Sequence, residues 1–269
     1  MPRSHRLAPI LSVALLAWAT HAAAESSIVL PLPPRFEEIA ATTYDAETGK
    51  AVGGGFIRFE RRGETGARME GATGIDGGAH TNLLAEFAVL PGDGGLRLLR
   101  QESRSVDVAG QAMGVLEIDH RAGEGRCTGP SLGGDPPETR TVELPADDRL
   151  VNVPMNLLFQ PIVRGERQEI RFQILLCGGG PRIVTAVARV AETEAQSVDG
   201  SRLVRIRYEL SLPKLLSRMV ARWLPHLSFW FDPDEAGAWI GNEMPLYSKG
   251  PTVLVVRRGF TPALLDALP

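Results

Sequence analysis

The sequence predicts a mainly β protein, and three observations support this prediction. Hydrophobic and polar residues alternate with a period of two over much of the chain, which is typical of strands with one buried face. Glycine-containing turn sequences separate these runs at short intervals. Gly (29) and Pro (20) are frequent among the 269 residues, while 43% of the chain is apolar. We therefore expect a curved antiparallel meander or incomplete barrel with one or two short helices.

The first 24 residues are typical of a secretory signal peptide. A basic start with Arg3 and Arg6 precedes an apolar run over residues 7–19, and the alanines at 22–24 fit a cleavage site. The run is shorter than the roughly 20 residues that span a membrane. Because no Arg pair indicates the twin-arginine route, we expect Sec export to the periplasm and a mature chain of residues 25–269. That chain has 27 basic and 32 acidic residues, a net charge of −5, which predicts no binding to nucleic acid.

The strands follow an extended leader. Residues 26–34 (SSIVLPLPP) predict this leader because three closely spaced prolines forbid a helix. The clearest strand places Ile57 and Phe59 on one face and Arg58 and Glu60 on the other. The strand candidates are residues 55–63, 67–73, 81–90, 96–108, 112–120, 139–144, 169–176, 182–191, 203–210, 227–231 and 252–257. We expect about ten strands in a single domain, because no linker or repeat divides the mature chain.

Two helical segments interrupt the strands. Residues 154–163 (PMNLLFQPIV) predict a short helix, with Pro154 suited to the first turn. The segment from Pro213 to Leu224 carries an apolar stripe at helical spacing and a second stripe of basic residues. The apolar stripe includes Leu216, Met219 and Trp223. This helix is a candidate for contact with a membrane surface.

Two cysteines, Cys127 and Cys177, remain in the exported chain. An oxidising compartment lets them pair, and both lie beside glycine-containing turns. We predict a structural disulfide. A redox-active pair is the less favoured alternative, since the C-x-x-C spacing is absent.

Two motifs resemble catalytic or metal-binding sequences. Residues 129–133 match the G-x-S-x-G pattern with Ser131 as nucleophile, but the glycines and prolines that follow do not favour the helix this motif requires. Residues 232–243 have the acid spacing of a calcium loop, yet Ala236 stands where an oxygen ligand is needed, so we predict an acidic turn. His80, His120 and His226 are too far apart in the sequence to indicate a metal site. We predict no catalytic residue, metal or cofactor.

The tryptophans of the mature chain gather in one window. Trp223, Trp230 and Trp239 lie there together with Phe229 and Phe231. Alternation places the two phenylalanines on one strand face and Trp230 on the other, so both faces require an apolar neighbour. We predict that these five residues bind a hydrophobic ligand, with Leu216 and Met219 on the covering helix. The alternative is a packed core capped by that helix.

Four stretches carry a resemblance to a known family: VELPADDRLVNVPMNLLFQ, IRFQILLCGGGPRIVTAVARV, SVDGSRLVRIRYEL and FWFDPDEAGAWIGNEMPLYSKGPTVLVVRRG. Over the last half of the chain the pattern resembles that of the exported bacterial proteins called domain of unknown function 3108. The resemblance implies a curved sheet or incomplete barrel. It implies no activity and no catalytic residues.

These observations favour a soluble, monomeric and non-enzymatic periplasmic envelope protein. Its predicted partner is an apolar small molecule, a lipid or a lipidated client protein. One alternative is a structural protein with a filled core that docks onto an envelope complex. A second alternative is an exported hydrolase.

Overall fold

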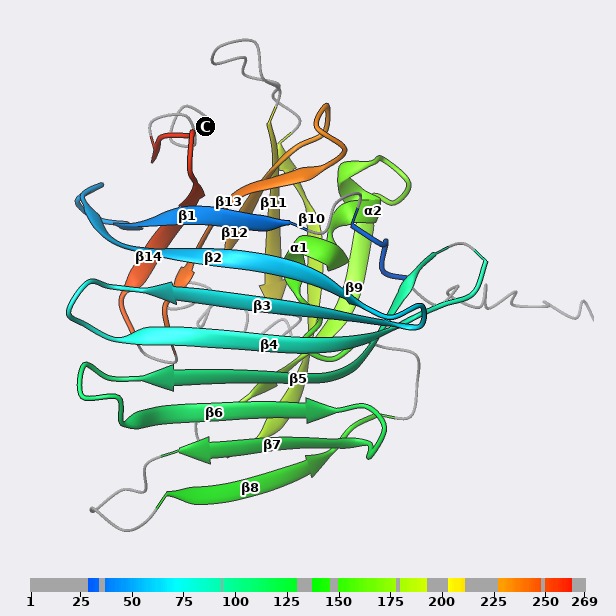
Figure 1. Cartoon of the computed structure of the whole chain (residues 1–269), viewed down its shortest axis with the longest axis horizontal. Helices are drawn as coiled ribbons and strands as arrows, with labels where there is room; N and C mark the ends of the chain where they lie inside the picture. Colours follow the sequence, from blue (N-terminus) through cyan, green and yellow to red (C-terminus); the bar gives the residue numbers. More distant parts are fainter. Residues whose placement is uncertain are drawn as a thin grey trace, which may run out of the picture.

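The structure is a computed structural model of the whole chain, shown in Figure 1. It describes residues 29–33, 37–92, 94–129, 137–145, 150–177, 180–192, 203–210, 227–247 and 250–262. Several predictions lie outside these residues: the signal peptide (1–24), Ser131, His226 and the helix from Pro213 to Leu224.

Fourteen strands form one sheet. They are β1 Glu38–Asp45, β2 Ala51–Arg62, β3 Gly66–Gly74, β4 His80–Val89, β5 Leu96–Val106, β6 Ala112–Asp119, β7 Glu124–Gly129, β8 Glu138–Glu143, β9 Glu169–Leu176, β10 Arg182–Glu192, β11 Val204–Leu210, β12 Ser228–Asp232, β13 Ala238–Pro245 and β14 Thr252–Arg257. The two helices, α1 Met155–Leu158 and α2 Gln160–Val163, lie between β8 and β9. The predicted mainly β, antiparallel fold with short helices is therefore confirmed.

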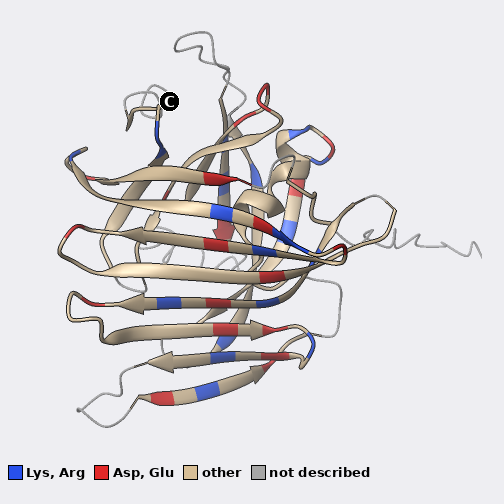
Figure 2. Cartoon of the chain, viewed as in Figure 1, with Lys and Arg blue, Asp and Glu red and all other residues tan. Residues whose placement is uncertain are grey.

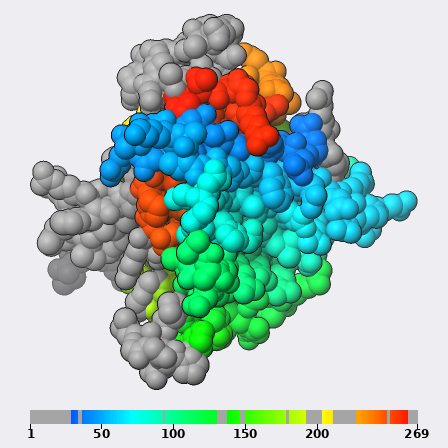
Figure 3. All heavy atoms as spheres, turned by 60° about the vertical axis from the view of Figure 1, so that its left-hand side comes forward, coloured from blue at the N-terminus to red at the C-terminus, as the bar shows by residue number. Residues whose placement is uncertain are grey.

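The strand order shows how the sheet is built. It runs β8-β7-β6-β5-β4-β3-β2-β1-β14-β13-β12-β11-β10-β9, and every neighbouring pair is antiparallel. Two meanders therefore join where β1 pairs with β14, from Ala41 opposite Arg257 to Asp45 opposite Val253. The end of β14 lies directly against β1 in Figure 3. The sheet is not closed, because β8 and β9 remain as its two edges.

The prediction of about ten strands was too low, and the three strands it missed have identifiable causes. The small residues of β1 (EIAATTYD) give little alternation. The glycines of β7 (EGRCTG) were interpreted as a turn. β13 overlaps the segment 232–243 that was interpreted as an acidic turn, whereas the turn itself covers only residues 233–237. There the Asp232 carboxylate accepts hydrogen bonds from the backbone N–H groups of Asp234 and Glu235 at 2.8 and 3.1 Å.

Charged side chains cover the outward face of the first meander. Figure 2 shows basic and acidic residues interspersed along β2–β8. Arg58 forms ion pairs with Glu70 and Glu38, and Arg100 lies 3.0 Å from Glu117. Such exposed pairs add little stability, about 0 to 1 kcal/mol each, but charges on a sheet discourage association with other sheets.

The inner face holds the main hydrophobic core, and the two helices pack into it. Leu158 and Phe159 are fully buried there. The Phe159 ring lies 5.9 Å from Phe172, 5.3 Å from Phe229 and 6.1 Å from Tyr208, measured between centroids. Burial also raises the pKa of the Tyr208 hydroxyl. The segment predicted as a short helix, residues 154–163, therefore packs against the concave face of the sheet and fills part of the core.

A separate cluster joins the two edges of the sheet. Leu175 of β9 packs with Ile118 and Cys127 of β6 and β7. Gly125 of β7 lies so close to Leu175 that a β-carbon there would come within 2.9 Å of its Cδ2 atom. The edges therefore meet by packing of side chains. We call this cluster the seam.

Two further features stabilise the seam. The predicted disulfide between Cys127 and Cys177 is present, and it connects β7 to the end of β9. Residues 150–152 run alongside the free edge of β9, where Gln173 donates its N–H to the Leu150 carbonyl at 3.0 Å and accepts from the Asn152 N–H at 2.9 Å. This short parallel pairing covers an edge that would otherwise be open to another chain.

Removing the disulfide should weaken the whole fold. The two cysteines are 50 residues apart, and the chain-entropy relation gives about 4 kcal/mol for a loop of that length. We expect the Cys127→Ser, Cys177→Ser variant to lose about 2 to 4 kcal/mol of unfolding free energy in denaturant titrations. A reductant should destabilise the wild-type protein and leave the variant unchanged. Equal stability of oxidised wild type and variant would show that the seam does not need the bond.

The seam should also make stability depend on pH through His120. Its ring hydrogen-bonds to the Val151 backbone carbonyl, while the buried Nε2 atom has no partner. Burial lowers the pKa of His120 below 6.5, although the bond to Val151 and nearby Asp119 oppose this shift. The unfolded chain therefore binds the proton more readily, and stability falls as pH drops from 6.5 towards the lowered pKa. Unfolding free energies at pH 7.5 and 5.5 should show a smaller decrease in His120→Gln than in wild type. His80→Gln, at an exposed position, should retain the wild-type decrease.

Candidate functional site

The predicted aromatic residues lie on both faces of β12. Phe229, Phe231 and Trp239 belong to the main core on the inner face. Trp230 belongs to a second cluster on the opposite face, as the alternation predicted. The Arg205 guanidinium stacks over the Trp230 ring at 5.3 Å.

Burial of these four residues favours the alternative of a packed core. Each has 5% or less of its surface exposed, and Phe229 is held against Phe159 of the α1–α2 turn. None of the four lines either of the two hollows described below. Trp223, Leu216 and Met219 lie outside the described residues, so the predicted covering helix stays a prediction.

A hollow that the sequence did not indicate lies at one mouth of the open barrel. It has a volume of about 250 Å³ and lies between the N-terminal segment and α2. Its lining residues are Val29, Leu30, Pro31, Leu32, Gly95, Pro161, Arg164 and Glu166. We call it the mouth hollow. Residues 29–33 are the dark blue segment beside α2 in Figure 1.

The N-terminal segment is an integral part of this mouth. Leu30 is fully buried in the main core, and its carbonyl accepts a hydrogen bond from the Leu96 N–H at 2.7 Å. Val29, in contrast, has 46% of its surface exposed. The predicted extended leader thus adds one short pairing to the start of β5 and forms one wall of the mouth hollow.

The opposite wall is the turn that ends α2. Pro161 is buried, and its carbonyl accepts hydrogen bonds from the N–H groups of Glu166 and Arg167 at 2.9 and 3.1 Å. Gly165 allows this tight turn because it has a φ of 72°. The turn therefore presents the exposed side chains of Arg164 and Glu166 at the rim from a well-defined backbone.

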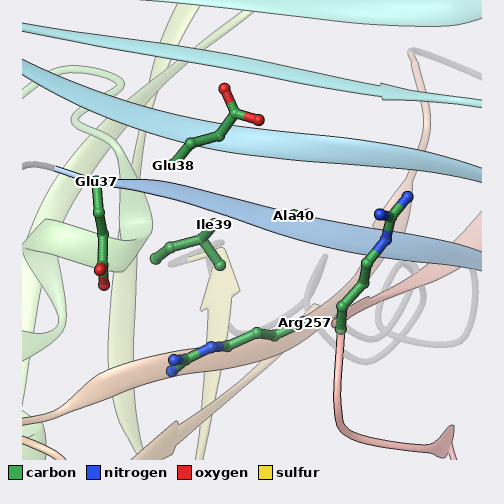
Figure 4. A pocket seen from close by; sticks show the side chains of 6 residues that line it. Glu37, Glu38, Ile39, Ala40 and Arg257 are labelled. Atoms are coloured by element: carbon green, nitrogen blue, oxygen red, sulfur yellow. The ribbon is translucent and has the colours of Figure 1, made fainter.

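A second, smaller hollow of about 140 Å³ lies between the start of β1 and the end of β14. Figure 4 shows Glu37, Glu38, Ile39, Ala40 and Arg257 around it. Glu38 points towards β2, where it lies 3.8 Å from Arg58, and Arg257 is bound by both carboxylate oxygens of Glu235 at 3.0 and 3.2 Å. This hollow is the smaller of the two and is therefore the weaker candidate for a ligand site.

Side chains that could bind a metal are dispersed over the described residues. No group of three His, Cys, Asp or Glu side chains in this part of the chain is placed to hold a metal ion. His80 and His120 lie at the ends of different strands. None of the described helices is long and apolar enough to cross a membrane.

The fold and its hollows define a class, an open β-barrel-like protein with a filled core and a small hollow at one mouth. No family model matches the chain, and no curated protein matches it. Among solved structures, the chain is similar to the beta-barrel-like protein of domain of unknown function DUF1849 from Brucella abortus. The identity is 8%, the TM-score is 0.44, and the match covers 82% of this chain and 94% of that chain. The resemblance to domain of unknown function 3108 stays a prediction.

The sequence reasoning missed the mouth hollow for a physical reason. Its walls come from residues 29–32, Gly95 and residues 161–166, which are far apart in the chain. The one usable signal was the apolar, proline-rich leader directly after the predicted cleavage site, because an exposed apolar segment of that kind requires a place to dock.

Truncating Phe159 tests whether the aromatic group is core. Phe159→Ala should lower the unfolding free energy by about 3 to 5 kcal/mol. The substitution loses the buried apolar surface of the ring and leaves a cavity between Phe172 and Phe229 that the surrounding side chains fill only in part. Val108→Ala is the control, since 74% of Val108 is exposed and its loss should cost little. A Phe159→Ala protein as stable as wild type would contradict the assignment of Phe159 to a packed core.

Proposed function

We propose that the protein is a non-enzymatic periplasmic envelope protein that binds an apolar ligand at the mouth of its open barrel. The observation that carries this proposal is the mouth hollow, whose floor is apolar and continuous with the main core through Leu30. Ligand sites are typically concave and apolar with a few polar groups that orient the ligand. In the mouth hollow, buried Leu30 and Pro161 form the back, while the exposed lining is mainly polar, with Arg164 and Glu166 as its charged side chains.

The proposed location follows from the sequence. The basic start, the apolar run and the alanines at 22–24 favour export, and the Cys127–Cys177 pair suits an oxidising compartment. The ligand in this setting is an apolar small molecule, a lipid or the acyl chain of a lipidated client. The predictions of a monomer and of no binding to nucleic acid remain to be tested.

A second candidate function is docking onto an envelope complex. The filled core around Phe159 and the charged outward face of β2–β8 support it, since neither needs a bound ligand. The hydrolase alternative rests on Ser131, which lies outside the described residues.

Native mass spectrometry of protein purified from the periplasm tests ligand binding. We expect an additional mass in the range of a small lipid that disappears after delipidation. Gly95→Leu should reduce the fraction carrying this mass, because any β-carbon at residue 95 overlaps the Val29 side chain and the larger residue fills the mouth hollow.

Two variants make this test specific. Gly129→Leu is the control, since no heavy atom lies within 4 Å of a β-carbon built there. Val29→Asp, at an exposed position on the rim, should also reduce the bound fraction without disturbing the core. Protein that carries no additional mass, or Gly95→Leu and Val29→Asp proteins that keep it, would favour the docking function.

A further inference from the structure

The seam differs from every other junction in the sheet, because side chains and one covalent bond form it in place of a backbone ladder. In the described part of the chain, β8 and β9 end the strand order and do not pair with each other. The buried members of the seam are Ile118, Cys127, Leu144, Val151 and Leu175. Because Cys127 is one of them, the disulfide to Cys177 lies within the apolar contact itself.

Buried polar atoms border the seam without hydrogen-bond partners. Within the described residues these atoms include Gln101 Oε1, His120 Nε2 and Gln173 Oε1. Gln101 lies directly opposite Ile118 on the neighbouring strand, and Gln173 is bridged to Val151. A polar atom that is removed from water and finds no partner costs free energy, and opening the seam would return these atoms to water. Desolvation of these atoms therefore offsets part of the packing at the seam.

The β7–β8 hairpin is joined to the rest of the protein differently from the other strands. Among the described residues, β6, β7 and β8 contribute no side chain to the main core, whose members come from residues 30–98 and 150–255. The hairpin is held by its ladder with β6 and by the seam. It can therefore move away from β9 while the main core stays packed.

The disulfide is open to attack from one side. Cys127 has 6% of its surface exposed, whereas Cys177, at the end of β9, is only half-buried. A thiolate of a dithiol reductant can attack the Cys177 Sγ atom, and the Cys127 sulfur then leaves as a thiolate and takes up a proton. The second thiol of the reductant releases Cys177 from the mixed disulfide. The protein disulfide thereby becomes two thiols, and the dithiol becomes a disulfide.

We propose that the seam is a redox-sensitive joint, in which reduction of the Cys127–Cys177 bond by a dithiol lets the β7–β8 hairpin separate from β9 without unfolding the main core. With the bond intact, the hairpin covers Leu175 and encloses the inner face. With the bond reduced, Ile118 and Leu175 become accessible to water. This inference does not depend on ligand binding at the mouth hollow.

Hydrogen exchange followed by mass spectrometry tests the proposal on the full protein with and without dithiothreitol. Reduction should add two hydrogen atoms to the intact mass and raise the exchange rates of the β7 and β8 amides at least about tenfold. The amides of β2–β4 and β12–β14 should stay protected over the same labelling time of minutes. The Cys127→Ser, Cys177→Ser variant should show the fast β7 and β8 exchange under both conditions.

A second variant tests the role of the unpartnered polar atoms. Gln101→Met replaces a buried amide with an apolar side chain of similar size, so it should slow β7 and β8 exchange in the reduced protein severalfold. Gln111→Met, at an exposed position, is the matched control and should behave as wild type.

Three results would overturn the proposal. The first is a disulfide that dithiothreitol does not reduce in the folded protein. The second is equal exchange of β7 and β8 in the oxidised and reduced forms. The third is a rise in exchange that extends equally over β2–β4 and β12–β14, which would show that the bond stabilises the whole fold and controls no separate joint.

Discussion

The packing of Leu175 against the inner face of β6 and β7 is the contact on which the rest of the structure depends. Fourteen antiparallel strands in one sheet leave two edges, and here those edges do not pair by hydrogen bonds. The seam instead joins them through apolar side chains, the Cys127–Cys177 bond and residues 150–152. Close approach requires Gly125, because a larger residue would meet Leu175. The seam maintains the curvature of the sheet, and this curvature encloses the inner face.

Once the sheet is curved, its two faces have different roles. The outward face of the first meander carries exposed ion pairs such as Arg58–Glu70 and Arg100–Glu117, and such charges discourage association with other sheets. The inner face is filled by the main core and by α1 and α2, so most of the concave side is not free for a ligand. The remaining space lies between the N-terminal segment and the turn after α2, both of which are held by backbone hydrogen bonds. A small mouth beside a packed core suits partial burial of a ligand chain.

The sequence predicted several elements because their signals are local. Alternation in GFIRFERRG and EIRFQILL is a property of neighbouring residues, and both segments are strands. Pro154 and the apolar residues after it similarly marked the short helices. The β13 strand was missed because AWIGNEMP follows an acidic turn whose spacing imitates a calcium loop, and its pairing with β12 and β14 is not visible from composition. The β7 strand was missed because its glycines were interpreted as turn residues, whereas Gly125 allows close packing at the seam.

By itself, the sequence determined the fold class, the opposite faces of Phe229 and Trp230, and the partners of the disulfide, since each depends on local alternation or on there being only two cysteines. Only the tertiary structure decided that β1 pairs with β14, that Phe159 packs against the aromatic strand, and that Leu30 lies beside Pro161. Those contacts join residues that are far apart in the chain. Their formation depends on the curvature of the whole sheet, which no local pattern specifies.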